Sequence, residues 1–129
     1  MRIAPITAIA GLAIAVAGGV AGVRAAPDQT LGMAIMSASV GPTGILLDGT
    51  GVDDVSHTGT GSYFVTFLRD LVGCNYVASV GRTDTFINNS GVASAWRPFD
   101  MPTSVLVLTH DFAGSLADRP FQVIVFCPR

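Results

Sequence analysis

Two histidines are the residues of this chain best suited to acid–base chemistry. His110 is followed directly by Asp111, and His57 comes shortly after Asp53 and Asp54. A histidine oriented by an aspartate can activate a serine hydroxyl as a nucleophile. The candidate nucleophiles are Ser56, Ser62 and Ser115. The chain lacks the Gly-x-Ser-x-Gly turn that presents such a serine in many hydrolases, so we predict no catalytic residue. A small serine hydrolase that uses His110 and Asp111 is the alternative hypothesis.

The same side chains could bind a metal ion, but their spacing does not support it. The chain has no His-x-His or His-x-x-x-His pair of the kind that holds transition metals. Asp48 and the pair Asp53–Asp54 flank glycine turns, yet the Asp-x-Asp-x-Asp-Gly order of calcium loops is absent. We therefore expect no metal and no other cofactor, and we interpret His57 as a turn residue and His110 as the end of a strand.

Trp96, Arg97 and Phe99 are the best candidates for recognition of a ligand. They lie in the segment Trp96-Arg97-Pro98-Phe99, which contains the sole tryptophan. Trp and Arg are enriched where binding energy concentrates, and a tryptophan near a loop can also stack on a sugar ring. The alternative is that Trp96 closes one end of the hydrophobic core.

The charged residues exclude some classes of partner. All nine acids are Asp and all seven bases are Arg, so that residues 26–129 hold five Arg against nine Asp, a net charge of −4. Such an acidic domain is a poor partner for nucleic acid or for an anionic membrane surface. Glu and Lys, both missing, are good helix formers, so the composition also favours strands and loops. The neighbours Asp118 and Arg119 are expected to form an ion pair or a turn pair.

The first 25 residues are typical of a signal peptide. Arg2 precedes an apolar stretch over residues 6–23, and Val23-Arg24-Ala25 fits the small residues of a cleavage site. Cleavage after Ala25 would leave one domain, residues 26–129, secreted or at the cell surface and not inserted in the membrane. The alternative is an uncleaved anchor, because the stretch of about 18 residues approaches the minimum for a membrane span.

Cys74 and Cys127 are the two cysteines, and both lie in the predicted exported part. Cysteines in small exported domains usually pair. Each alternates with apolar residues two positions away, so both sulfurs are expected on core-facing sides of strands. We predict a Cys74–Cys127 disulfide, with two free buried thiols as the alternative.

Short apolar segments separated by Gly and Pro turns recur along the chain. No segment keeps a helical period over more than two turns. About eight strands are expected, at residues 33–40, 45–48, 52–56, 62–69, 74–80, 92–96, 104–110 and 121–127, with a turn over 57–61. This spacing predicts an all-β domain, an antiparallel β-sandwich or jelly roll.

Several of these segments are similar to known β-domains. The glycine turn at residues 59–61 and the alternating strand at 62–67 resemble a run in phage tail-fibre domains. Most of residues 26–129 also resembles small exported bacterial domains, some of them attached to collagen-like stalks. The shared features are Gly51–Val55, Arg69-Asp70, Cys74–Ala78, and the ending from Asp118-Arg119-Pro120-Phe121 through Phe126-Cys127. This resemblance implies a β-domain that displays or recognises something outside the cell, and it brings no catalytic signature.

These observations predict an exported, non-enzymatic β-domain that acts by binding. Its ligand would be a glycan, a surface polymer or another protein, and the domain could act as a homo-oligomer. A second class of hypothesis is the serine hydrolase based on His110 and Asp111. A third is a structural envelope or assembly protein whose sheet edges pair between subunits.

Overall fold

The computed structural model describes residues 32–84 and 90–128, and these residues form eight β-strands. The strands are β1 (Met33–Val40), β2 (Leu46–Thr50), β3 (Val52–Gly59), β4 (Ser62–Phe67), β5 (Asn75–Val80), β6 (Val92–Trp96), β7 (Ser104–His110) and β8 (Phe121–Pro128). The predicted all-β class is confirmed. No membrane-crossing helix is found in the described part of the chain. The predicted signal peptide, residues 1–25, lies outside the described residues.

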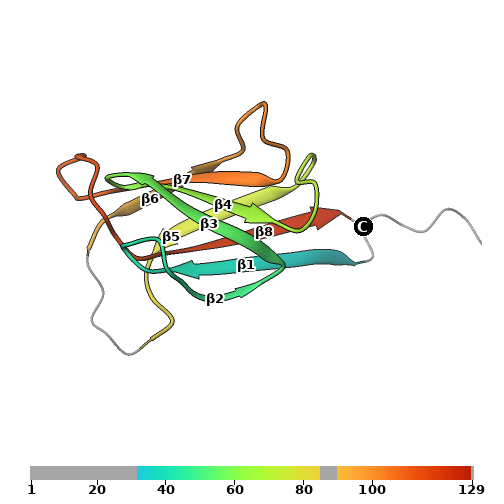
Figure 1. Ribbon diagram of the computed structural model, residues 1–129, viewed down its shortest axis with the longest axis horizontal. Helices are drawn as coiled ribbons and strands as arrows, with labels where there is room; N and C mark the ends of the chain where they lie inside the picture. Colours follow the sequence, from blue (N-terminus) through green and yellow to red (C-terminus); the bar gives the residue numbers. More distant parts are fainter. Residues whose placement is uncertain (1–31, 85–89, 129) are drawn as a thin grey trace, which may run out of the picture. The chain divides into compact units, whose positions relative to one another are not determined.

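Two antiparallel sheets of four strands pack together as a β-sandwich (Figure 1). The strand order is β2-β1-β8-β5 in one sheet and β3-β4-β7-β6 in the other. Four connections pass from one sheet to the other, namely β2–β3, β4–β5, β5–β6 and β7–β8, which is typical of jelly-roll-like sandwiches. β1 and β8 pair over their full length, so Met33 and Pro128 lie side by side at one end of the sandwich.

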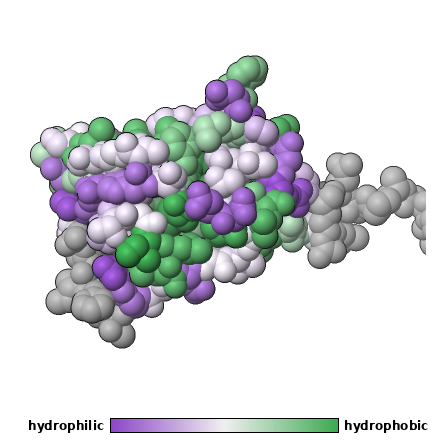
Figure 2. Space-filling view, viewed as in Figure 1, coloured by the Kyte–Doolittle hydropathy of each residue, from purple (hydrophilic) through white to green (hydrophobic). Residues whose placement is uncertain are grey.

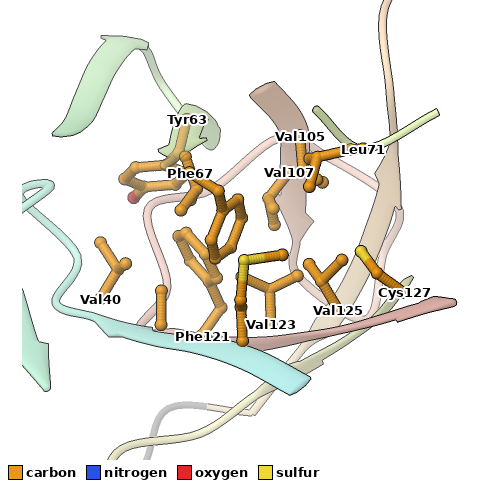
Figure 3. Packing of buried hydrophobic residues seen from close by; sticks show 13 residues of the cluster. Val40, Tyr63, Phe67, Leu71, Val105, Val107, Phe121, Val123, Val125 and Cys127 are labelled. Carbon is orange, nitrogen blue, oxygen red and sulfur yellow. The ribbon is translucent and has the colours of Figure 1, made fainter. Parts of the chain in front are cut away.

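Strand alternation fills the space between the sheets with apolar side chains. β4 buries every second residue (Tyr63, Val65 and Phe67), and β8 does the same from Phe121 to Cys127. Figure 3 shows these side chains meeting between the sheets with others from β1 and β7, including Val40, Val105 and Val107. Each fully buried Val or Phe contributes about 1.5–3 kcal/mol relative to an exposed one. The core is therefore the main force that holds the two sheets together.

The predicted disulfide between Cys74 and Cys127 is present. Cys127 is fully buried in β8, and Cys74 lies just before β5. The bridge fastens the loop that contains Leu71, a core residue with only 1 % of its surface exposed. The Leu71 N–H donates to the Pro102 carbonyl at 2.8 Å. The Leu71–Pro102 hydrogen bond thus joins the β4–β5 loop to the β6–β7 loop, and the disulfide joins the β4–β5 loop to β8.

The turn predicted over residues 57–61 is shorter in the structure. β3 continues to Gly59, so His57 is a strand residue and its interpretation as a turn residue is wrong. The chain reverses at Gly61, which has a left-handed φ of 65°. A Cβ at Gly61 would lie 2.4 Å from the Thr109 carbonyl oxygen. The reversal therefore needs only Thr60 and Gly61, whereas the sequence suggested a turn of five residues.

Candidate binding surface

Trp96, predicted to bind a ligand, ends β6 and faces away from the core. Ala93 and Ala95 pack against the core cluster, so the alternate positions of β6 point outward. Trp96 keeps 41 % of its surface exposed. The alternative interpretation, in which this tryptophan closes one end of the core, is therefore wrong.

Two further apolar residues lie beside Trp96 in the same sheet. Trp96 is paired with Leu106 of β7, and Leu106 is paired with Phe64 of β4. Neighbouring strands are about 4.8 Å apart, so the three residues form a row roughly 10 Å wide across the outer face. We call Phe64, Leu106 and Trp96 the aromatic row, after the two aromatic residues on either side of the aliphatic Leu106. Sequence reasoning missed Phe64 and Leu106, although the alternation that places Tyr63 and Val65 inside already places Phe64 outside.

The aromatic row is flanked by hydroxyl side chains and has no charged neighbour within its strands. β4, β6 and β7 contain neither Asp nor Arg, and the chain contains no Lys or Glu. On one side of the row, Ser62 and Ser94 flank Leu108. On the other side, the hydroxyls of Thr66 and Ser104 are hydrogen-bonded at 2.8 Å. This face offers apolar contact and neutral hydrogen-bonding groups, but no ion pair from these three strands.

The other two predicted binding residues occupy different surroundings. The Arg97 N–H donates to the Tyr76 hydroxyl at 2.9 Å, and the Arg97 guanidinium donates to the Pro98 carbonyl at 3.4 Å. Phe99 lies in a turn closed by a hydrogen bond from the Met101 N–H to the Pro98 carbonyl, and it is 98 % exposed. Figure 2 shows an apolar tip at the top of the molecule, where Figure 1 places the β6–β7 loop. Trp96 thus faces solvent from the sheet, whereas Phe99 does so from the β6–β7 loop.

A His–Asp contact does exist, but between residues that the sequence did not pair. The Nε2 atom of His57 lies 3.0 Å from Oδ1 of Asp118, and the His57 ring stacks on Tyr63 with centroids 4.6 Å apart. The Gly61 N–H donates to the same Asp118 oxygen at 2.7 Å. The Tyr63 hydroxyl donates to the Pro42 carbonyl at 2.7 Å and lies 3.3 Å from Asp118 Oδ1.

The electrostatics of this cluster indicate a structural role. The Gly61 N–H stabilises the Asp118 carboxylate and, with a smaller contribution from His57, lowers its pKa. Burial, reinforced by the Asp118 charge, raises the pKa of Tyr63 to about 12. Asp118 therefore fastens the β7–β8 loop to the β3–β4 turn. The expected ion pair between Asp118 and Arg119 is replaced by main-chain bonds, because the Arg119 guanidinium donates to the carbonyls of Ser90 and Asp118.

The residues of the hydrolase alternative have other local roles. The Asp111 carboxylate accepts hydrogen bonds from the N–H groups of Ala113 at 2.9 Å and Ser115 at 3.0 Å, which stabilises the turn after β7. The Ser62 hydroxyl is bonded to the Thr58 hydroxyl at 3.0 Å. His110 ends β7, as predicted. The hydrolase hypothesis stays a prediction, which reaction of the folded protein with a fluorophosphonate probe would test.

Comparison of the chain with protein-family models, with curated proteins and with solved structures finds no match. The resemblance to phage tail-fibre and stalk-attached exported domains therefore stays a prediction. The interpretation of the binding surface depends on its own geometry and chemistry.

Proposed function

We propose that this protein is an exported, non-enzymatic domain that binds a neutral glycan at or outside the cell surface through the aromatic row. The disulfide supports the extracellular part of the proposal, because such bonds persist in non-reducing surroundings. The observation that supports binding is an exposed tryptophan aligned with Phe64 and Leu106 on a sheet face whose central strands have no charged residue.

A glycan suits the composition of this face. Its sugar rings have apolar C–H surfaces that can pack on Trp96 and Phe64, and its hydroxyls can both donate and accept hydrogen bonds. Ser62, Ser94 and Thr66 supply hydroxyls of the same kind on the same sheet. A charged partner would meet no counter-charge on β4, β6 or β7, and Asp54 on the edge strand β3, opposite Thr66, would repel an anion.

Trp96 makes the proposal directly measurable, since it is the sole tryptophan and its fluorescence reports on this face alone. Soluble oligosaccharides and insoluble cell-wall polysaccharides would be offered to the secreted, oxidised protein. We expect a fluorescence change on binding and an affinity at least about tenfold lower in Trp96→Ala, as for a tryptophan that acts as a binding hot spot.

Phe112→Ala is the matched control, because Phe112 is a 77 % exposed aromatic on the β7–β8 loop, outside the aromatic row. Equal losses of affinity in Trp96→Ala and Phe112→Ala would overturn the assignment of the surface. Failure of the wild-type protein to bind any glycan of a broad panel would overturn the assignment of the ligand.

Export is tested separately by the intact mass of the protein recovered from the culture medium. We expect a chain that begins at Ala26 and is two hydrogens lighter than the reduced form, because Cys74 and Cys127 are bonded. Full-length protein confined to the membrane fraction would instead support the uncleaved anchor. A dimer or trimer in the same native spectrum would support avid binding by a homo-oligomer.

A further inference from the structure

The opposite outer face of the sandwich, on the sheet β2-β1-β8-β5, contains a groove with a volume of about 200 Å³. Its lining includes the apolar side chain of Ile124 and five polar side chains: Ser37, Ser39, Asp48, Thr83 and Gln122. The core-facing residues Ala38 and Val123 also border it, but they are buried, so their main chain forms the floor. The groove is separate from the aromatic row, which lies on the other sheet.

The groove arises where Thr83, in the segment that follows β5, reaches the outer face of this sheet. Asp48, Ser39 and Gln122 are direct cross-strand neighbours on β2, β1 and β8. The Thr83 hydroxyl, from the segment after β5, donates to the Ser39 hydroxyl at 3.2 Å. Ser39 is consequently only 4 % exposed, although alternation directs it away from the core. Thr83 thus forms one wall of the groove.

Three polar groups in this groove have unused hydrogen-bonding capacity. One oxygen of Asp48 accepts the Gly49 N–H at 2.8 Å, and its other oxygen has no partner in the described part of the chain. The Gln122 amide and the Ser37 hydroxyl likewise have no side-chain hydrogen bond among the described residues. An amide and a hydroxyl can each donate and accept, while a carboxylate only accepts.

We propose that this groove binds a neutral polyhydroxyl ligand of monosaccharide size. Sugar hydroxyls donate and accept at once, which complements the mixed set of Asp48, Gln122 and Ser37. Ile124, 40 % exposed, supplies an apolar wall for a C–H face of the ligand. Pockets for drug-sized ligands usually span about 300–1,000 Å³, so a groove of about 200 Å³ requires a smaller molecule.

Two other ligand classes fit the groove less well. An anion would be repelled by Asp48, and none of the described lining residues is an Arg. A divalent cation needs several oxygen or nitrogen ligands with more negative charge, and among residues 32–84 and 90–128 no group of three or more His, Cys, Asp or Glu could hold one. A neutral hydroxyl-rich ligand is the class that uses Asp48, Gln122, Ser37 and Ile124 together.

The test is a titration of ¹⁵N-labelled oxidised protein with glucose, galactose, mannose and N-acetylglucosamine, followed by amide chemical shifts. We expect one of these sugars to shift the amides of β1, β2 and β8 around the groove. Gln122→Ala and Asp48→Asn should each weaken that binding by about three- to tenfold, the effect of losing one hydrogen bond. Ser37→Leu, which fills the groove from an outward position, should abolish it, whereas Trp96→Ala should leave it unchanged.

The outcomes separate this site from the proposed function. Shifts confined to β4, β6 and β7 would overturn the groove as a site while supporting the aromatic row. Absence of any shift at sugar concentrations of tens of millimolar would overturn the proposal, and so would shifts of the groove amides by Ca²⁺ but not by sugar. Retained binding in both Gln122→Ala and Ser37→Leu, with folding confirmed by their spectra, would also overturn it.

Discussion

The Cys74–Cys127 disulfide should provide a large share of the stability of this domain. The bridge joins residues separated by 53 positions. Chain-entropy theory gives about 4 kcal/mol for closing a loop of this length in the unfolded chain. Domains of this size are stable by about 5–15 kcal/mol in total. Breaking the bridge should therefore remove a quarter or more of the free energy of unfolding.

The perturbation is the double substitution Cys74→Ala/Cys127→Ala, which opens the loop without burying a new polar group in the core. Alanine suits the site because Cys127 is fully buried between the sheets. We expect a midpoint of thermal unfolding lower by roughly 15–30 °C, from about 4–8 °C for each kcal/mol in a domain of this size. Leu71 should lose its burial first, because the bridge fastens its loop to β8.

The assay is urea unfolding of the oxidised wild type and of the double variant, followed by Trp96 fluorescence and far-ultraviolet circular dichroism. The slope of free energy against urea should rise in the variant, because an unbridged chain exposes more surface on unfolding. Wild-type protein with reductant is the control, and it should match the variant. A loss below about 1 kcal/mol would refute the reasoning, since the bridge would then restrict the unfolded chain far less than loop closure requires.

Three further predictions concern the cluster around Asp118. Tyr63→Phe removes the hydroxyl that donates to the Pro42 carbonyl and should lower the free energy of unfolding by about 1–2 kcal/mol in urea titrations. Asp118→Asn should flatten the pH dependence of stability in acid. Because the pKa of Asp118 is lowered in the folded state, its carboxylate stabilises the fold above the unfolded-state pKa near 4, and this stabilisation is lost as the pH falls through the folded-state pKa. The wild type should therefore lose more stability than the variant between pH 7 and pH 2. Gly61→Ala should cost at least about 2 kcal/mol in thermal or urea unfolding, because of the left-handed φ and the close Thr109 carbonyl, and a change below 0.5 kcal/mol would contradict the assigned geometry.

The fold and the disulfide were predictable from local patterns. The alternation of Tyr63, Val65 and Phe67 identified the inner face of β4, and the position of Cys127 two residues after Val125 placed its sulfur in the core. Both inferences need only the period of two that every strand imposes on its side chains. They do not depend on which strand lies beside which.

The candidate binding surface required information that local patterns lack. The aromatic row exists because the register aligns Phe64, Leu106 and Trp96, and strand order and register follow from packing of the whole chain. His57 and Asp118 are 61 residues apart and meet only when the β7–β8 loop folds onto the β3–β4 turn. The sequence therefore identified Trp96, and alternation could direct Phe64 outward, but local patterns could not place Phe64 and Leu106 beside Trp96.

The distribution of charge links the fold to the proposed binding role. The charged side chains of the strands lie on β2 and β3, which are each the edge of a sheet: Asp48 on β2, and Asp53 and Asp54 on β3. Charge on an edge strand opposes pairing with the edge of another copy. The central strands β1, β4, β7 and β8 contain neither Asp nor Arg, so both outer faces are neutral at their centres. The Asp residues oppose assembly of copies through the β2 and β3 edges, and the sheet faces are neutral at their centres. This distribution favours binding through the sheet faces.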